Sequence, residues 1–265
     1  MIRKMNFPAE LIVYLQRVER AVVLTGAGVS QESGLRTFRD AQSGLWAQYR
    51  PEDLATPEAF ARDPKLVWDW YAMRREKVRT VEPNPAHLAL ARMARFFPDF
   101  CLVTQNVDGL HLEAERRLAA ASPLQRAYPI IELHGSLARV RCALCGQPAE
   151  RWKEVDQDVP RCALCGGLLR PDVVWFGEAL PREALEQAVE AARSCQVFFS
   201  VGTSGVVQPA ASLAYAAHNR GAVLVEVNAE PTPLTEKADF ALHGKAGEIL
   251  PALVEAVWTG ASGAQ

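Results

Sequence analysis

The sequence lacks the features that would tie it to a membrane, a nucleic acid or an export route. No segment approaches the roughly 18 apolar residues that a membrane-spanning helix needs. The net charge is only -2 and no run of five or more like charges occurs, so nothing attracts the whole chain to nucleic acid or anionic lipid. The first apolar run is short and is interrupted by Glu10, Gln16 and Arg17, which favours an amphipathic helix over a signal peptide. We therefore expect a cytoplasmic protein that contacts neither membranes nor nucleic acid directly. Separately, we expect it to be a monomer.

Short apolar runs alternate with helical patterns along the 265 residues. With 49% hydrophobic and 23% charged residues, the chain has the composition of an ordinary globular protein with a real core. The alternation predicts an α/β fold, a doubly wound parallel sheet with helices on both faces, in which ligands bind beyond the carboxyl ends of the strands. The apolar runs cover 21–28, 100–104, 129–133, 197–202 and 222–228, and the helical patterns cover 8–20, 85–96, 108–120, 181–193 and 209–220.

Two stretches break this alternation and are predicted to form a smaller lobe. Residues 41–84 carry helical segments without a clear strand, and Thr56 with Pro57 would cap and begin one of the helices. Residues 138–170 hold most of the cysteines and little apolar core. We expect both insertions to pack against the larger domain and to leave a binding cleft between the two. The larger domain then consists of 1–40, 85–137 and 171–265.

Four of the six cysteines form two CxxC pairs within a repeated hexapeptide, RCALCG, at 141–146 and 161–166. The spacing C-x2-C-x16-C-x2-C is typical of a tetrahedral zinc site in which each turn supplies two thiolates. Four protein ligands leave no open position for water, so the ion would be structural and would stabilise a lobe too small to fold alone. The alternatives are thiols that bind nothing, a redox pair, or a nucleic-acid ribbon, for which a basic aromatic surface is missing. The predicted ligands are Cys142, Cys145, Cys162 and Cys165.

Glycines and small polar residues follow three of the predicted strands. Gly26 and Gly28 permit a tight turn and a close approach of backbone N–H groups to phosphate, although Gln31 stands where a G-x-G-x-x-G fingerprint has its third glycine. The alternative is a plain turn from strand to helix. The motifs GTSG (202–205) and VNAE (227–230) end two further strands with groups suited to phosphate and ribose. Because the carboxyl ends of parallel strands share one edge, the three motifs together favour a nucleotide site.

Two more strand ends carry side chains suited to binding and catalysis. In TQNVDGLH, the trio Gln105, Asn106 and Asp108 could bind ribose hydroxyls and a carboxamide. In ELHGSL, His134 stands at a strand end beside a glycine and is a candidate general base, because an imidazole of pKa about 6.5 accepts a proton near neutrality. A lone histidine is more often structural than catalytic, and the chain has four others.

The motifs GAGVSQESGLRTFR, TQNVDGLH, HGSL, the two CxxC pairs, PDVVWFGE, GTSG and VNAE occur in the order seen in sirtuins, the NAD-dependent protein lysine deacylases. The chain resembles this family over about residues 15–250, nearly its whole length. The resemblance implies a Rossmann-like NAD-binding domain, a smaller helical and zinc-binding lobe, NAD consumed as a co-substrate, and one structural Zn²⁺. It also implies that the substrates are acylated-lysine proteins bound as extended peptides.

The resemblance assigns roles to individual positions. His134 matches the catalytic base. The segment Val173, Val174, Trp175, Phe176 and Gly177 matches the strand that pairs with the substrate peptide by strand addition. The positions that match the family's cofactor-binding residues are Gly26, Ala27, Gly28, Ser30, Gly34, Thr37, Phe38, Arg39, Trp46, Gln105, Asn106, Val107, Asp108, Gly202, Thr203, Ser204, Asn228, Ala229, Glu230 and Ala246.

In the chemistry that the resemblance implies, the acyl oxygen attacks the anomeric carbon of NAD and nicotinamide leaves. His134 then helps a ribose hydroxyl attack the resulting imidate, and water completes the release of amine and O-acyl-ADP-ribose. Two other functions stay open: a protein mono-ADP-ribosyltransferase that uses the same cofactor, and a non-enzymatic NAD sensor or interaction module. Mass spectrometry of the products separates the first from deacylation, and an unchanged biological output of His134→Tyr would support the second.

One departure from the common sirtuin pattern points to the acyl group. Many sirtuins read GIPDFR where this chain reads GLRTFR, with Arg36 and Thr37, a variant typical of the branch that includes desuccinylases. That branch also resembles this sequence at the Y-x-x-R pair, here Tyr71 and Arg74. A guanidinium fork beside a tyrosine hydroxyl can hold the carboxylate of a succinyl or malonyl group. The alternative is a surface helix with solvated arginines, and Arg75 is expected on a different part of the helix face.

Overall fold

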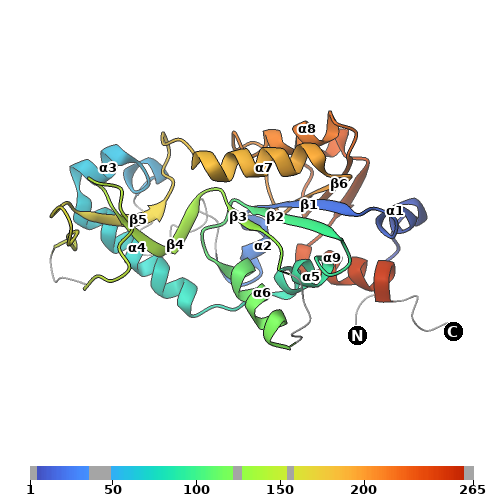
Figure 1. Cartoon of the computed structure of the whole chain (residues 1–265), viewed down its shortest axis with the longest axis horizontal. Helices are drawn as coiled ribbons and strands as arrows, with labels where there is room; N and C mark the ends of the chain where they lie inside the picture. Colours follow the sequence, from blue (N-terminus) through green and yellow to red (C-terminus); the bar gives the residue numbers. More distant parts are fainter. Residues whose placement is uncertain (1–4, 36–48, 122–126, 154–157, 260–265) are drawn as a thin grey trace.

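Six parallel strands form the main sheet, in the order β3-β2-β1-β6-β7-β8 (Figure 1). The structure is a computed structural model that describes residues 5–35, 49–121, 127–153 and 158–259. The strand order reverses direction between β1 and β6, which makes that position the topological switch point of the sheet. The strands are β1 Arg20–Thr25, β2 Asp99–Thr104, β3 Ile130–Glu132, β6 Val197–Val201, β7 Val223–Asn228 and β8 Phe240–His243.

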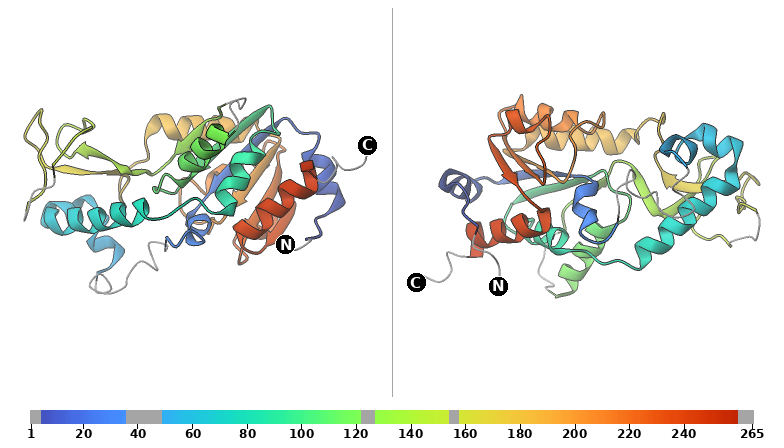
Figure 2. Two further views of the ribbon diagram at one scale, coloured as in Figure 1. Left: turned by 90° about the horizontal axis from the view of Figure 1, so that it is seen from below. Right: turned by 180° about the vertical axis from the view of Figure 1, so that it is seen from behind.

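Helices cover both faces of the main sheet, as Figures 1 and 2 show. Neighbouring side chains of β1 point to opposite faces, so Val22 and Leu24 pack with α7 and α8, while Val23 packs with α1, α5 and α9. All three are buried, and burying such a side chain contributes about 1.5–3 kcal/mol to folding. The helices are α1 Ala9–Leu15, α5 Pro85–Met93, α6 Leu110–Ala121, α7 Arg182–Ser194, α8 Ser212–His218 and α9 Ala246–Val254.

A smaller group of elements lies at one end of the main sheet (Figure 1). It contains the helices α3 Pro57–Arg62 and α4 Pro64–Arg79, and an antiparallel pair of strands, β4 Gly135–Cys142 and β5 Leu169–Val173. These elements and the loops between β4 and β5 are called the small lobe. Its core packs Phe60, Trp68 and Trp70 against Leu137 and Trp175.

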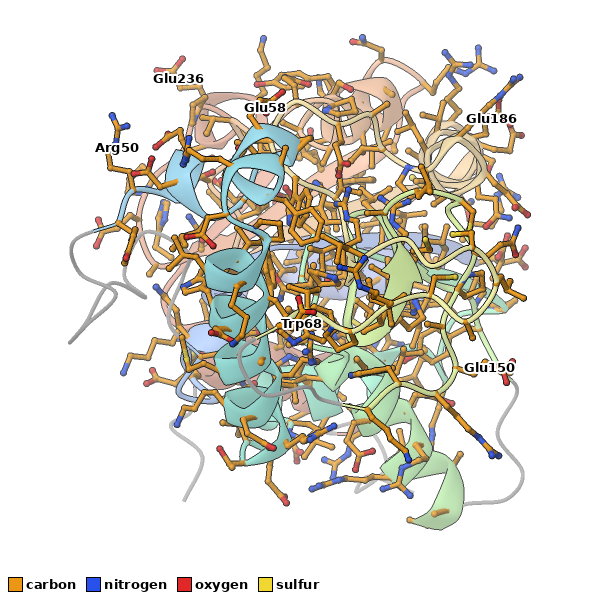
Figure 3. All side chains as sticks on the ribbon, turned by 90° about the vertical axis from the view of Figure 1, so that its left-hand side faces the viewer. Arg50, Glu58, Trp68, Glu150, Glu186 and Glu236 are labelled. Carbon is orange, nitrogen blue, oxygen red and sulfur yellow. The ribbon has the colours of Figure 1, made fainter. Side chains whose placement is uncertain are left out.

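Helix α4 presents the aromatic residues of the small lobe. It begins where Asp63 Oδ1 accepts the backbone N–H of Leu66 at 3.0 Å, and a proline occupies its first turn. Figure 3 shows Trp68 on the inner side of this helix, whereas the labelled Glu150 and Glu186 lie at the outer surface. The aromatic face of α4 is therefore turned into the protein.

The observed elements match most of the predicted ones. All five predicted strands are present, and Thr56 Oγ1 accepts the N–H of Ala59 at 3.0 Å, which confirms the predicted cap of α3. Two elements near the carboxyl terminus escaped prediction. Strand β8 is a four-residue edge strand with alternate residues exposed, and α9 contains Pro251 within its helical run. Four residues are too few to show a clear alternation, and a proline within a run argues against a helix.

Other predicted boundaries differ from the structure. The helix predicted over 8–20 ends at Leu15, and the one predicted over 209–220 begins at Ser212. The division into two domains stays a prediction, and the small-lobe core includes Leu137, which that division assigns to the larger domain. Within the described part of the chain, no helix is both long enough and apolar enough to cross a membrane.

Candidate active site

The loops that follow β1, β2, β6 and β7 meet at one edge of the main sheet, which we call the cofactor edge. Thr25 ends β1 and lies opposite Thr104 of β2 and Val201 of β6, while Val201 lies opposite Val227 of β7. The motifs TQNVD and VNAE begin at Thr104 and Val227, and GAGVS and GTSG begin directly after Thr25 and Val201. The parallel registers therefore bring all four motifs together, as predicted.

Gly26 and Gly28 allow the first of these loops to touch the GTSG loop. A Cβ at Gly26 would lie 2.7 Å from Thr203 Cβ, and a Cβ at Gly28 would lie 2.8 Å from the carbonyl oxygen of Gly202. The N–H of Gly26 donates to Val201 O at 3.0 Å, and the N–H of Gly28 donates to Gly202 O at 2.8 Å. Both N–H groups thus donate within the protein. Contact between two loops, and not an approach of these N–H groups to phosphate, explains the two glycines.

Three polar side chains link the GAGVS and TQNVD loops. Ser30 Oγ donates to Asp108 Oδ2 at 2.7 Å and accepts from Asn106 Nδ2 at 3.0 Å. Asn106 Nδ2 also donates to Gly26 O at 3.1 Å. Burial raises the pKa of Asp108, against the opposing effect of the N–H of Leu110 and the Ser30 hydroxyl. Because both amide hydrogens of Asn106 are used, its Oδ1 is the atom left to accept a hydrogen bond from a ligand.

His134 lies between β3 and β4, beside the TQNVD loop. Its Nδ1 is 2.9 Å from the carbonyl oxygen of Gln105. A carbonyl can only accept, so this contact assigns the proton to Nδ1 and leaves the lone pair on Nε2. Burial lowers the pKa of His134, and the contact with Gln105 opposes this only in part. The imidazole is therefore neutral near pH 7 and can take up a proton at Nε2.

The glycine after His134 is required by the fold. Gly135 has φ +77°, and a Cβ there would lie 2.1 Å from the carbonyl oxygen of Asp172 on β5. Any side chain would push β4 and β5 apart. Gln105 adds a link on the opposite side, because its Nε2 donates to Thr203 Oγ1 at 2.9 Å. His134 is thus held between the small lobe and the cofactor edge.

A buried polar cluster beneath the cofactor edge was absent from the prediction. Thr25 Oγ1 donates to Thr104 Oγ1 at 2.8 Å and contacts His111 Nε2 at 2.9 Å. The ring of His111 lies 4.7 Å from that of His87, centroid to centroid, and both histidines are buried. Burial lowers the pKa of His87 to about 4 and the pKa of His111 well below its ordinary value. The position of His111 at the end of TQNVDGLH was the available signal.

A second contact that escaped prediction joins the two ends of the chain. Glu32 Oε1 accepts the N–H of Gly247 at 2.8 Å, in the first turn of α9 beside the predicted cofactor residue Ala246. A carboxylate at the start of a helix is favourable, because the N–H groups there have no partner within the helix. A Cβ at residue 247 would lie 2.5 Å from Glu32 Oε2, so a larger residue there would displace the carboxylate from this contact. No local pattern in the sequence signals a contact of this range.

The other predicted cofactor residues lie along the same edge or outside the described residues. Ala27 begins α2 (Ala27–Gln31), and Gly34 follows it with φ +80°. Asn228 ends β7, and its Nδ2 donates to the carbonyl of Glu230 at 2.9 Å across Ala229. Ser204 follows Thr203 in the GTSG loop, and Val107 accepts the N–H of Leu137 at 2.8 Å. The predicted residues that fall outside the described part of the chain are Thr37, Phe38, Arg39 and Trp46.

Tyr71 and Arg74 both lie on the inner side of α4. Tyr71 is buried, and its hydroxyl accepts the indole N–H of Trp175 at 3.0 Å. The guanidinium of the half-buried Arg74 lies 4.8 Å from the ring centroid of Trp70 and 6.0 Å from that of Tyr71. Burial lowers the pKa of Arg74, while Tyr71 and Asp108 act in the opposite direction. Arg74 is therefore close enough to the TQNVD loop to interact with its carboxylate.

Arg75 points elsewhere, as the sequence predicts. Its guanidinium lies 4.7 Å from the ring centroid of Trp68 and 5.8 Å from that of Trp152, inside the small lobe. Arg75 is buried at 6% exposure and Arg74 is half-buried, so the alternative of solvated arginines does not hold for this pair. The arginine contributes to packing within the small lobe.

The segment 173–177 begins at the end of β5 and contacts the backbone of His134 and of Ala55. The N–H of Val174 donates to His134 O at 2.9 Å, and the N–H of Phe176 donates to Ala55 O at 2.9 Å. The side chain of Phe176 is 56% exposed, whereas Trp175 is buried. Strand addition by a peptide stays a prediction, and it would use backbone groups other than these two N–H groups.

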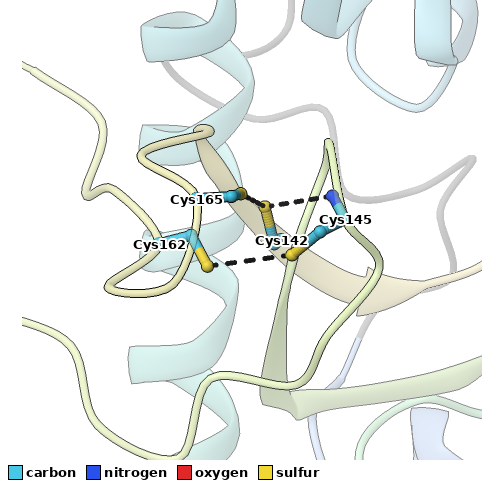
Figure 4. A group of neighbouring side chains, drawn as sticks. All are labelled: Cys142, Cys145, Cys162 and Cys165. Atoms are coloured by element: carbon cyan, nitrogen blue, oxygen red, sulfur yellow. Dashed lines mark hydrogen bonds between the residues drawn. The ribbon is translucent and has the colours of Figure 1, made fainter.

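The four predicted zinc ligands form one cluster in the small lobe (Figure 4). All four Sγ atoms lie within 4.8 Å of one another, and the separations Cys142–Cys165 and Cys145–Cys162 are 3.4 and 3.9 Å. A tetrahedral ion with Zn–S bonds of about 2.3 Å needs sulfur atoms about 3.8 Å apart, so the cluster fits zinc. The N–H of Cys145 is the main cause that lowers the pKa of Cys142 to about 6, which favours the thiolate.

Comparisons with known proteins agree with this arrangement. A model of the Sir2 family matches residues 26–209. The NAD-dependent protein deacylase of Pyrococcus furiosus is 48% identical over 255 residues, which covers 94% of this chain and 97% of that protein. The NAD-dependent protein deacylase 2 of Pyrobaculum aerophilum is 51% identical over 236 residues, which covers 89% of this chain and 90% of that protein.

Two solved structures are also similar to this chain. A Sir2 homolog in complex with NAD has a TM-score of 0.87 at 45% identity and covers 99% of this chain and 98% of its own. A complex of Sir2 with a p53 peptide and NAD+ has a TM-score of 0.77 at 29% identity and covers 96% and 99% of the two chains.

Proposed function

The chain belongs to the Sir2 family and is an NAD-dependent protein deacylase, and from that premise we propose that it removes succinyl and malonyl groups as well as acetyl groups from lysine. The observation that carries the finer proposal is the position of Arg74. Its guanidinium lies over Trp70, near the hydroxyl-bearing Tyr71, and interacts with Asp108 of the TQNVD loop. A cation at the junction of the small lobe and the cofactor edge suits an acyl chain that ends in a carboxylate.

The cofactor edge supplies the groups that hold NAD. When bound, NAD supplies the ADP-ribose that accepts the acyl group and releases nicotinamide. We infer that Asn106 Oδ1 accepts from the nicotinamide carboxamide, because both hydrogens of its amide already donate to Ser30 and Gly26. The adenosine side would follow Asn228 and Ala246, which end β7 and begin α9. His134 would take a proton from a ribose hydroxyl at Nε2, since Nδ1 is held by Gln105.

The small lobe binds the rest of the substrate in this proposal. We infer that an acylated protein lies as an extended peptide along 173–177. The similar Sir2 structure with a p53 peptide and NAD+ supports the binding of a peptide as such. The acyl-lysine would enter between this segment and the GTSG loop. Zinc at the four cysteines would stabilise the fold of the lobe and take no part in the reaction, because four thiolates leave it no open position.

The acyl selectivity can be tested with Arg74→Met, which keeps an unbranched stem of similar length to the aliphatic part of arginine and removes the guanidinium and its charge. We expect desuccinylation to be lost while part of the deacetylation remains. A hydrogen bond to a charged group is worth about 1.5–3 kcal/mol, so kcat/KM for succinyl relative to acetyl should fall roughly 10- to 150-fold. The measurement compares peptides that differ only in the acyl group, at saturating NAD.

The matched control is Arg79→Met on the same helix. Arg79 is exposed and pairs with Glu76 at 3.0 Å, so its loss should leave the succinyl-to-acetyl ratio as it is. An Arg74→Met enzyme that loses both activities by the same factor would refute the acyl selectivity. Deacetylation itself, with O-acetyl-ADP-ribose detected as the product, would remain.

A further inference from the structure

The hydroxyl of Tyr71 accepts a hydrogen bond from Trp175. The indole N–H of Trp175 is a donor and cannot accept, so at 3.0 Å it must donate to the oxygen of Tyr71. The hydroxyl proton of Tyr71 then points elsewhere, and no acceptor for it is found in the described part of the chain. Tyr71 is 2% exposed and Trp175 is 3% exposed. A buried donor without an acceptor costs free energy. A substrate that brings an acceptor to the Tyr71 hydroxyl removes this cost and therefore binds more tightly.

The hydroxyl stays a donor at neutral pH. Burial raises the pKa of Tyr71 to about 12, and the nearby Arg74 opposes this rise only in part. Arg74 follows Tyr71 by three residues on α4, and its guanidinium lies 6.0 Å from the tyrosine ring. One neutral donor and one cation are thus adjacent, which suits a carboxylate and offers little to an acetyl methyl group.

The indole that sets this arrangement is itself held from two sides. The guanidinium of Arg170 lies 3.3 Å from the ring centroid of Trp175. Arg170 pairs with Glu178 through two contacts, of 2.5 and 2.8 Å, and Glu178 Oε2 also accepts the backbone N–H of Trp175 at 2.8 Å. Arg170 is 7% exposed, and the ring of Phe60 lies 5.3 Å from that of Trp175. The direction of the indole N–H is therefore fixed by an ion pair and by ring packing.

We propose that Trp175 is a positioning residue for acyl selectivity: its indole N–H occupies the oxygen of Tyr71 and so directs the tyrosine proton to the carboxylate of a succinyl or malonyl group. This inference rests on the proposed function, since it concerns the same acyl site. It assigns to the side chain of Trp175 a role separate from the backbone of 173–177. The Arg170–Glu178 pair then affects selectivity indirectly, because it holds the indole of Trp175 in place.

The variant Trp175→Phe tests this inference, because it keeps an aromatic ring under Arg170 and removes the N–H. Without that donor the hydroxyl of Tyr71 can rotate and donate its proton in another direction. A neutral hydrogen bond is worth about 0.5–1.5 kcal/mol, so the succinyl-to-acetyl ratio of kcat/KM should fall roughly 2- to 13-fold. Tyr71→Phe should lower the ratio at least as far. The double variant should fall no further than Tyr71→Phe, because Trp175 acts through the tyrosine hydroxyl.

Two results would overturn the inference: an unchanged ratio in Trp175→Phe, or effects of the two single variants that multiply in the double. Trp258→Phe is the control for a general loss of an indole, since Trp258 stacks on Phe96 far from the small lobe and should keep the ratio. If Trp175→Phe does not fold, Glu178→Gln replaces it, because it weakens the pair with Arg170 and keeps the indole. The ratio should then fall by a smaller factor, and an unchanged ratio counts against the inference.

The outcome is separable from that of the proposed function. An Arg74→Met enzyme with an unchanged succinyl-to-acetyl ratio removes the acyl selectivity and this inference with it. A large fall for Arg74→Met combined with a wild-type ratio for Trp175→Phe removes the role of Trp175 alone.

Discussion

The cofactor edge and the acyl side of the small lobe are assembled in different ways. At the cofactor edge each functional loop directly follows a parallel strand, and the order of the strands alone brings the loops together. In the small lobe, Tyr71 meets Trp175 over 104 positions of sequence, through side chains on a helix and a loop. The edge thus follows from topology and the acyl side from tertiary packing. Changes at the edge should affect all acyl substrates alike, and changes in the small lobe should separate one acyl group from another.

Loss of the metal is expected to have the largest effect. It should unfold the small lobe, so that a change outside the cofactor edge also affects all acyl substrates alike. Cys142 and Cys162 are part of the small-lobe core, together with Trp68 and Trp175. Structural zinc in small peptides contributes apparent binding energies of about 10–16 kcal/mol at neutral pH. We expect Cys162→Ser to lose its zinc, to unfold the small lobe and to lose activity on every acyl peptide. Metal content by atomic absorption and hydrogen exchange of β4 and β5 measure this.

Cys195→Ser is the matched control for the zinc experiment. Cys195 is buried in the core on the α7 side of the main sheet and lies outside the four-cysteine cluster, so this variant should keep its zinc. The amides of β1 and β2 should stay protected from hydrogen exchange in Cys162→Ser, because these strands belong to the core of the main sheet and Cys162 belongs to the core of the small lobe. A Cys162→Ser enzyme that retains succinyl selectivity without metal would show that the small lobe does not need zinc.

The second prediction concerns the cofactor edge. General base catalysis contributes typically about 10²- to 10⁴-fold, so His134→Ala should lower kcat by that factor on acetyl and succinyl peptides equally. Burial lowers the pKa of His134, so its neutral form persists to a lower pH than that of an ordinary histidine. Wild-type kcat/KM should therefore fall only below about pH 6.5. A loss confined to one acyl group would place His134 in acyl selection and remove the contrast between the two regions.

The contrast also explains how much the sequence could predict. The polar residues of the cofactor edge were predictable because each follows an apolar run, and the metal ligands were predictable from a repeated hexapeptide. The bond from Trp175 to Tyr71 and the ion pair of Arg170 with Glu178 were not, since their directions depend on how β5 packs on α4. For Gly28 the position was predicted but its reason was different, because contact with Gly202 exists only once β1 and β6 are paired.

The smallest predicted effect is on stability in acid and sharpens the comparison. His87 is fully buried with its pKa lowered to about 4, so the unfolded chain, with a histidine pKa near 6.5, binds the proton more readily. The free energy of unfolding should thus have its full value above about pH 6.5. It should fall by up to about 3 kcal/mol as the pH drops to 4, because the unfolded chain then binds a proton that His87 does not bind in the folded protein. Urea unfolding at pH 7 and pH 4.5 measures this, and His87→Gln should flatten the dependence.

The acid effect should begin beneath the cofactor edge. None of the five histidines belongs to α3, α4, β4 or β5, so the small lobe has no buried imidazole to protonate. Hydrogen exchange at pH 5 should show opening of α5 and α6 before α4. The reverse order would mean that another group governs the acid response.

The contact between Glu32 and Gly247 has a consequence for the order in which the protein is made. Strand β1 pairs with β2, which follows soon after it in the sequence. The other neighbour of β1, strand β6, begins only at Val197. Gly247, the partner of Glu32, lies 215 residues after Glu32. A ribosome releases the chain from the amino terminus, and contacts between distant positions form slowly. The nascent protein therefore has its zinc ligands and His134 in place long before the cofactor edge can close. Because the proposed NAD site includes Ala246 at the start of α9, we expect NAD to bind the nascent protein only after this helix has been made.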